Sequence, residues 1–179
     1  LVTSVRFSIC PGCVPPVKAA VQEALVASSA PAGLLGAFLA EVGEVNTLCC
    51  FFACGEAAES LEAIDRWLDT VQAGAAGAKL RHVERILHRS SAGTQAWQAL
   101  VEASGVALVQ RVFDRGHGPD LPAGGLRLDP LTGRHGQTWL LTPATSHDEA
   151  LALCLAGGRD PQQPLRDSVM WIPAHHSPA

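Results

Sequence analysis

The predicted architecture depends most on LLGAFLAEVGEVNTLCCFFA, residues 34–53. Residues 34–42 and Thr47–Ala53 are two apolar runs of strand length, and Gly43 lies where a tight reversal needs a positive φ angle. Asn46, at the exit of this loop, has a side chain that can hydrogen-bond nearby backbone. These features predict two neighbouring antiparallel strands joined by a hairpin.

The segment before this hairpin has a different, alternating pattern. Over residues 3–10, Val5, Phe7 and Ile9 fall on one face of a strand and Arg6 falls on the other. This alternation predicts a strand with one buried side. If that strand is central in the sheet, Arg6 must be paired or must line a polar cavity.

Over the whole chain, the predicted elements follow the order β α β β α β α β β α β. Residues 73–78 are small and predict a connector, whereas residues 114–136 are rich in Gly and Pro and predict an irregular stretch, either a functional lid or a mobile excursion. The predicted strands are 3–10, 34–42, 47–53, 82–89, 106–113, 138–141 and 168–172, and the predicted helices are about 15–28, 56–72, 91–104 and 146–155.

This order predicts an α+β fold with two similar halves, residues 1–89 and 90–179. Each half approximates a ferredoxin-like sheet with two helices on one face. Such a sheet leaves its other face exposed, and the simplest way to bury that face is against the second sheet. We therefore expect two fused ferredoxin-like halves that pack sheet to sheet as an intrachain α+β barrel.

Composition narrows the classes of function. The chain has 179 residues, of which 47% are hydrophobic, so it is long enough and apolar enough to bury a sizeable core. Its net charge of −4 and scattered basic residues argue against nucleic acid as a partner. No apolar run reaches the length of a membrane span, and the first ten residues lack the pattern of a secretory signal. We expect a cytoplasmic protein.

Residues 36–46, Gly-Ala-Phe-Leu-Ala-Glu-Val-Gly-Glu-Val-Asn, followed by an apolar strand and an acidic helix, resemble the signature hairpin of the NIPSNAP family, in the dimeric α+β barrel superfamily. The resemblance extends back to the Pro11–Pro15 turn and forward to about Arg89. It implies a pseudo-dimer of tandem halves. Where that family commonly shows His, Trp and Tyr on the next strand, this sequence has Cys50, Phe52 and Cys54.

Several side chains are candidates for a ligand pocket. Glu41, at the end of an apolar strand, would lie at a barrel rim, where a carboxylate pairs with a cation or faces a ligand. The tryptophans would pack the core or a pocket wall. The pocket candidates are Arg6, Glu41, Cys50, His88, Trp97 and Trp139.

Histidines offer a second kind of site. His82, Glu84 and His88 share one face of a predicted strand, so a metal or proton-transfer site is geometrically feasible there. We favour the simpler interpretation, an edge strand with solvated charges. His117 and His135 lie in the irregular stretch, where they could close over a pocket or remain exposed.

The six cysteines are interpreted mostly as reduced, small apolar residues. The Cys10-Pro-Gly-Cys13 motif at a helix start could lower a thiol pKa, but the pattern lacks the βαβ context of a thioredoxin-like motif, so we favour a structural turn. A zinc site built from these two residues with Cys49, Cys50 and Cys54 fails on spacing. We expect no metal and no cofactor.

The sequence also lacks a Gly-x-Ser-x-Gly elbow, a phosphate-binding Gly-x-x-x-x-Gly-Lys-Ser/Thr loop and a dinucleotide fingerprint. Two hypotheses remain. In the first, the protein binds a small organic molecule in a cleft between sheet and helices, as a cofactor-free enzyme of the monooxygenase or isomerase type. In the second, it is a non-catalytic binding or protein-interaction module. The expected partners are a small-molecule ligand and, in a homo-oligomer, further copies of the chain.

Overall fold

The computed structural model describes residues 1–26, 33–53, 57–74, 80–114, 119–156 and 165–174, leaving aside the side chains of residues 57–61, 82, 83 and 94. The elements are β1 (Val2–Ile9), α1 (Val14–Val26), β2 (Leu34–Val42), β3 (Thr47–Ala53), α2 (Ala57–Gly74), β4 (Leu80–Ser90), α3 (Thr94–Ala103), β5 (Ala107–Asp114), β6 (Leu126–Pro130), β7 (Gln137–Ala144), α4 (His147–Ala156) and β8 (Leu165–Pro173).

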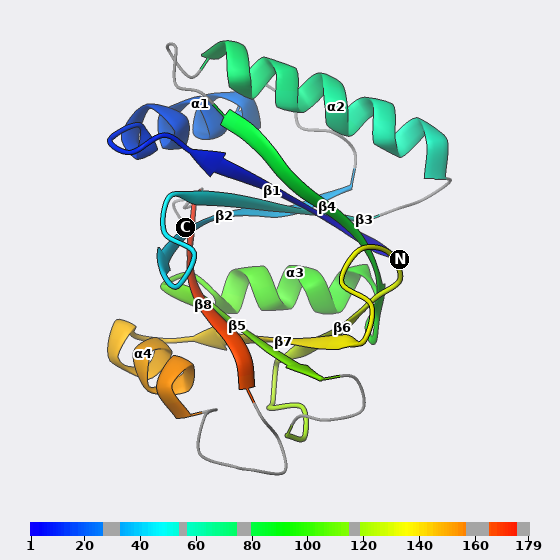
Figure 1. The fold of residues 1–179 in the computed structure, drawn as a ribbon, viewed down its shortest axis with the longest axis vertical. Helices are drawn as coiled ribbons and strands as arrows, with labels where there is room; N and C mark the ends of the chain where they lie inside the picture. The colour runs from blue at the N-terminus through cyan, green and yellow to red at the C-terminus, as the bar shows by residue number, and fades with distance from the viewer. Residues whose placement is uncertain (27–32, 54–56, 75–79, 115–118, 157–164, 175–179) are drawn as a thin grey trace.

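The strands form one closed antiparallel barrel in the order β1-β3-β2-β8-β5-β7-β6-β4 (Figure 1). The run β4-β1-β3-β2 comes from the first half of the chain and is called the N-terminal arc. The run β8-β5-β7-β6 comes from the second half and is called the C-terminal arc. Two seams join the arcs by strand pairing, β2 with β8 and β4 with β6. Closure of this kind leaves no free sheet edge.

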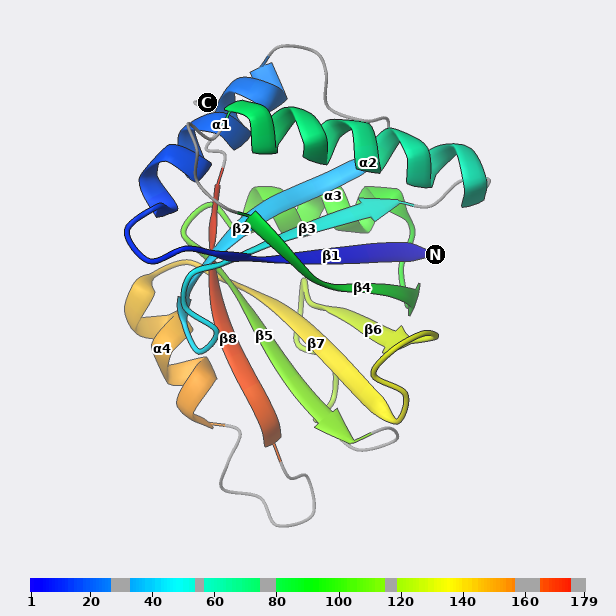
Figure 2. The same ribbon diagram turned by 45° about the horizontal axis from the view of Figure 1, so that its top comes forward.

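Helices α1 and α2 cover the outer face of the N-terminal arc and lie against each other (Figure 2). Ile64, Trp67 and Val71 recur along α2 at helical spacing and are buried in a cluster with the outward side chains of β1 and β3. The amphipathic helix predicted over this region is confirmed. Burial of its apolar stripe fixes α2 on the arc.

The C-terminal arc is covered differently. Helix α4 packs on the outside of β5, β7 and β8. Helix α3 instead lies between the two arcs (Figure 1), where Trp97 and Leu100 join the cluster that fills the inner face of the barrel. Within the described residues, the second half therefore has one helix on the outer face of its arc.

The predicted fold class, α+β with two fused ferredoxin-like halves packing sheet to sheet, is wrong. The structure is one closed eight-strand antiparallel barrel with four short helices, in which strands outweigh helices. The expectation of a dimeric α+β, ferredoxin-like architecture is overturned by the same observation. The physical reason is that the arcs do not simply stack, because hydrogen bonds along both seams join them into a single sheet.

The predicted order of elements is confirmed with one addition. Strand β6 falls inside residues 114–136, the stretch predicted to be irregular, and it forms one of the two seams. The hairpin prediction is also confirmed: Gly43 has φ +88° and Asn46 has φ 60°. In the described part of the chain, no helix combines the length and the apolar character needed to cross a bilayer.

Candidate functional site

Arg6 is the centre of the candidate site. Its neighbours Val5 and Phe7 face the helices, so the alternation of β1 directs Arg6 into the barrel, where its exposed fraction is 1%. Its guanidinium carbon lies 4.8 Å from the ring centroid of Trp139 and 5.5 Å from that of Trp171. Two indole faces therefore stabilise the buried cation by cation–π attraction.

Two hydrogen-bond acceptors complete the surroundings of this cation. Arg6 Nη1 donates to Glu44 Oε2 at 2.7 Å, and Nη2 donates to Gln110 Oε1 at 3.0 Å. The same Gln110 oxygen accepts from Trp171 Nε1 at 3.1 Å. Because Gln110 lies on β5 and Arg6 on β1, the site spans both arcs. Arg6 is therefore paired, as its position in a central strand requires.

Glu44 reaches Arg6 because of the β2–β3 hairpin. Gly43 has a positive φ, and a Cβ at this position would lie 2.6 Å from the carbonyl oxygen of Ser168, so glycine is required on both grounds. Glu44 follows directly, with its side chain 32% exposed. Arg134 lies 3.8 Å from Glu44 and 2.9 Å from Glu84. These three partly exposed side chains, Glu44, Glu84 and Arg134, are called the rim cluster.

His88 lies on the inner face of β4 and is fully buried. Its Nε2 is 2.7 Å from Ser4 Oγ, and its ring centroid is 4.5 Å from that of Trp139. Burial, reinforced by the charge of Arg6 and opposed by Asp129, lowers the pKa of His88 to about 3. His88 is therefore neutral at physiological pH. The predicted solvated edge strand is wrong, because β4 pairs with both β1 and β6.

Cys49 is the thiol of the inner face. It lies beside Arg6 across the β1–β3 ladder and is fully buried. Burial raises the pKa of Cys49 to about 12, although Arg6 opposes the shift. Cys49 is therefore a neutral thiol. The pocket candidate Cys50 points the other way, into the apolar layer beneath α1 and α2.

Four polar atoms of this region have no hydrogen-bond partner in the described part of the chain. They are Arg6 Nε, Gln110 Nε2, His88 Nδ1 and Glu84 Oε2. Most buried polar atoms in proteins have partners, so four such atoms in one interior call for an explanation. Two are hydrogen-bond donors, one is an acceptor, and the role of His88 Nδ1 depends on its tautomer.

The other candidates lie apart from Arg6. Glu41 is 48% exposed and its Oε2 lies 3.0 Å from His147 Nε2, at the start of α4. Trp97 packs on Phe51 at 5.3 Å between ring centroids, and its Nε1 donates to Ser90 Oγ at 3.2 Å. His135 is exposed. His117, Cys54 and the side chain of His82 lie outside the described residues.

The structure thus brings three predicted residues together, Arg6, His88 and Trp139. It adds Glu44, Gln110 and Trp171, which the sequence analysis missed. Gln110 gave one usable signal, since it and Arg111 are the polar residues in the otherwise apolar stretch 106–113. Glu44 lies in the β2–β3 hairpin, and no comparable pattern in the sequence indicated that its side chain reaches Arg6.

A cleft between sheet and helices does exist, but it lies elsewhere. It is an open groove beside α2, lined by Phe7, Asp65, Leu68, Asp69 and Arg85. None of the pocket candidates lines it. In the described residues, no three His, Cys, Asp or Glu side chains come together in a way that could hold a metal ion.

Comparison with known proteins adds no relative: no protein-family model, no curated protein and no solved structure matches this chain. The resemblance to the NIPSNAP family remains a prediction. The functional argument therefore depends on the geometry of the barrel interior.

Proposed function

We propose that the barrel interior binds a small organic carboxylate, with Arg6 as its anchor. The observation that carries this proposal is the set of buried polar atoms without partners around Arg6. A carboxylate carries the acceptor oxygens that Arg6 Nε and Gln110 Nε2 lack. The indoles of Trp139 and Trp171 are fully buried and pack against the Arg6 guanidinium, so they hold the anchor in position.

The rim cluster supplies a route for exchange. Glu44 now neutralises Arg6, but it is about a third exposed and Arg134 lies 3.8 Å away on its other side. An incoming carboxylate would replace Glu44 on Arg6, and Glu44 would then pair with Arg134. The charge of Arg6 stays compensated throughout, which avoids leaving a buried cation without a partner.

Binding without catalysis is the better supported role. A general base works best when its pKa lies near the operating pH. The pKa of His88 is about 3, so His88 is a weak base, and Cys49, with a pKa of about 12, is a poor nucleophile. His88 Nδ1 instead contributes a neutral hydrogen-bonding atom to the ligand.

The experiment is a titration of the protein with a panel of aromatic and aliphatic carboxylates, matched to their uncharged amides, followed by tryptophan fluorescence and native mass spectrometry. Arg6→Met should weaken the best carboxylate about tenfold or more, the effect of losing hydrogen bonds to a charged group. The matched control is Arg111→Met, since Arg111 is also buried on a strand but lies beside Phe113 and outside the site.

Glu44→Gln distinguishes the ligand classes. The variant removes the carboxylate that competes for Arg6, so it should bind the carboxylate ligand more tightly than the parent does. A cationic ligand held by Glu44 and Glu84 would show the reverse. The proposal fails if Arg6→Met, folded by circular dichroism, binds as the parent does, or if amides and carboxylates bind alike.

A further inference from the structure

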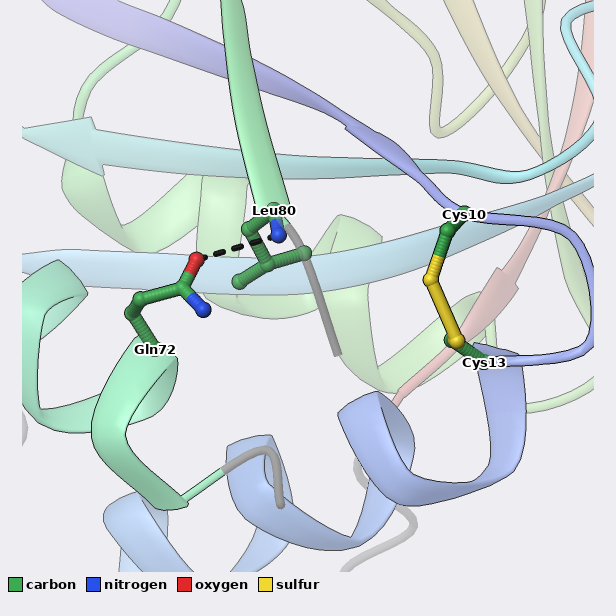
Figure 3. The surroundings of a disulfide bond; sticks show 4 residues. All are labelled: Cys10, Cys13, Gln72 and Leu80. Atoms are coloured by element: carbon green, nitrogen blue, oxygen red, sulfur yellow. Dashed lines mark hydrogen bonds between the residues drawn. A yellow bond between two sulfur atoms is a disulfide. The ribbon is translucent and has the colours of Figure 1, made fainter. Parts of the chain in front are cut away.

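A disulfide joins Cys10 and Cys13 across the turn between β1 and α1 (Figure 3). Pro11 and Gly12 form the exposed tip of this turn, Gly12 has φ +81°, and the Cys13 N–H donates to the Cys10 carbonyl at 3.0 Å. The prediction that the cysteines are reduced is therefore wrong for this pair. It is confirmed for Cys49, Cys50 and Cys154, which are free.

The topology places this pair in a βαβ unit. The unit is a split one: β1 and β2 both pair antiparallel with β3, which lies between them, so they run parallel to each other and α1 is the crossover. The context that the sequence analysis found missing is thus present in the fold. A Cys-x-x-Cys pair at the strand-to-helix turn of such a unit is the arrangement typical of thiol–disulfide exchange sites.

The two sulfurs differ in their surroundings. Cys10 lines an open groove together with Ser8, Gln72, Leu80 and Arg81. In Figure 3 the Gln72 side chain, which accepts the Leu80 N–H at 3.0 Å, lies across this region from the disulfide. Arg81 brings a positive charge to the groove, which favours the approach of a thiolate.

Cys13 directly precedes the first residue of α1, whose first turn has no acidic residue. Because Pro15 and Pro16 have no N–H, Val14 alone among the first three helical residues can offer one. The helix dipole, more than a set of N–H donors, therefore stabilises a thiolate on Cys13. A sulfur stabilised in this way is the better leaving group.

The remaining described thiols have the opposite environment. Cys49, Cys50 and Cys154 are buried, and burial raises the pKa of each. Such thiols are unreactive towards external disulfides. The partial exposure of Cys10 and Cys13 therefore distinguishes this pair from the three buried thiols.

We propose that Cys10–Cys13 is a thiol–disulfide exchange site that accepts two electrons from a dithiol. A thiolate of the dithiol attacks Cys10 Sγ from the groove, the Cys10–Cys13 bond breaks, and Cys13 leaves as a thiolate that takes up a proton. The second thiol of the dithiol then loses its proton and attacks the first sulfur of the dithiol, the one bonded to Cys10 Sγ in the mixed disulfide. Cys10 is released and protonated, and the dithiol becomes a disulfide.

The first test measures exchange in the folded, oxidised protein, in a Cys54→Ser background so that the structure places every remaining thiol. Dithiothreitol is the dithiol, and alkylation with mass spectrometry reports each cysteine. We expect Cys10 and Cys13 to be reduced without loss of circular dichroism and to be reoxidised by glutathione disulfide, while Cys49, Cys50 and Cys154 stay unlabelled. Reduction that requires denaturing urea would overturn the proposal and make the disulfide purely structural.

The second test separates the two sulfurs. Cys13→Ser leaves Cys10 free, and at a pH where both thiols are ionised this variant should react with glutathione disulfide, releasing glutathione, about tenfold faster than Cys10→Ser does. Cys10 lines the groove whereas Cys13 packs against the apolar core, so access sets the difference in rate. Equal rates would contradict the assigned direction of attack.

A third test concerns Arg81. In the intact disulfide protein, Arg81→Gln should slow reduction by the anionic thiol glutathione and make the rate of reduction less dependent on salt. Arg89→Gln, an exposed arginine at the far end of β4, is the control that should change neither.

Discussion

The two faces of the N-terminal arc are made by alternate residues of the same strands, yet they form opposite environments. Beneath α1 and α2, Val5, Phe7, Leu48 and Phe52 pack in an apolar layer. On the inner face, Arg6 is buried among indoles, an amide and a carboxylate. A shift of one residue in register would exchange the two sets.

The difference lies in the polar groups, because both faces bury apolar side chains in a core cluster. Only the inner face of this arc adds a buried charged group to that apolar surface. On the inner face, desolvation of charges costs free energy that their pairing offsets only in part. A buried ion pair can often be replaced by apolar residues without loss of stability. The proposed carboxylate site would account for buried polar groups that folding alone does not require, and three measurements address the contrast between the two faces.

The largest effect is expected from Trp67→Ala in the outer layer. Trp67 is 2% exposed and packs edge-to-face on Phe52 at 5.9 Å between centroids. Its truncation should lower the free energy of unfolding by about 3–5 kcal/mol, measured by urea denaturation. Ligand affinity of the folded fraction should not change. The control Trp67→Phe should cost far less, because it keeps an aromatic ring and removes only an indole N–H that has no partner among the described residues. A change in affinity would mean that the faces are coupled.

A smaller effect is expected from Glu44→Gln on the inner side. The variant leaves Arg6 buried without its carboxylate and should cost roughly 3 kcal/mol, the low end of the range for a buried pair that loses one partner. Glu41→Gln is the matched control: its exposed pair with His147 should contribute about 0–1 kcal/mol. Equal costs for the two variants would show that Arg6 does not depend on Glu44.

The smallest effect, counted per pH unit, is expected on the pH dependence of the free energy of unfolding. The pKa of His88 is about 3 in the folded protein and 6.5 in the unfolded chain, so the unfolded chain binds the extra proton between these values. The contribution of His88 to stability is fully present above pH 6.5. As the pH drops towards 3, the free energy of unfolding should fall by up to about 1.4 kcal/mol per pH unit. His88→Asn should flatten this slope. A slope parallel to that of the parent protein would contradict a buried, neutral His88.

Local pattern was sufficient for most of the secondary structure. Period-two alternation located β1, helical spacing located α2, and Gly43 located the hairpin. Strand β6 was missed because its alternation covers only five residues, Leu126–Pro130, in a stretch rich in Gly and Pro, and because its seam partner β4 is distant in sequence. The predicted fold class was wrong for the same reason, since β6 forms the seam with β4 that closes the barrel.

The candidate site also has one part that the sequence indicated and one part that only the tertiary structure decided. The sequence alone indicated that Arg6 faces away from Phe7 and must be compensated, because the strand period is a local property of the backbone. It could not indicate that Glu44, Gln110, Trp139 and Trp171 would surround it. Those contacts join residues 38 to more than 100 positions apart. The contacts of Arg6 with Gln110, Trp139 and Trp171 cross from one arc to the other, and they exist because two seams of hydrogen bonds close the arcs into one barrel.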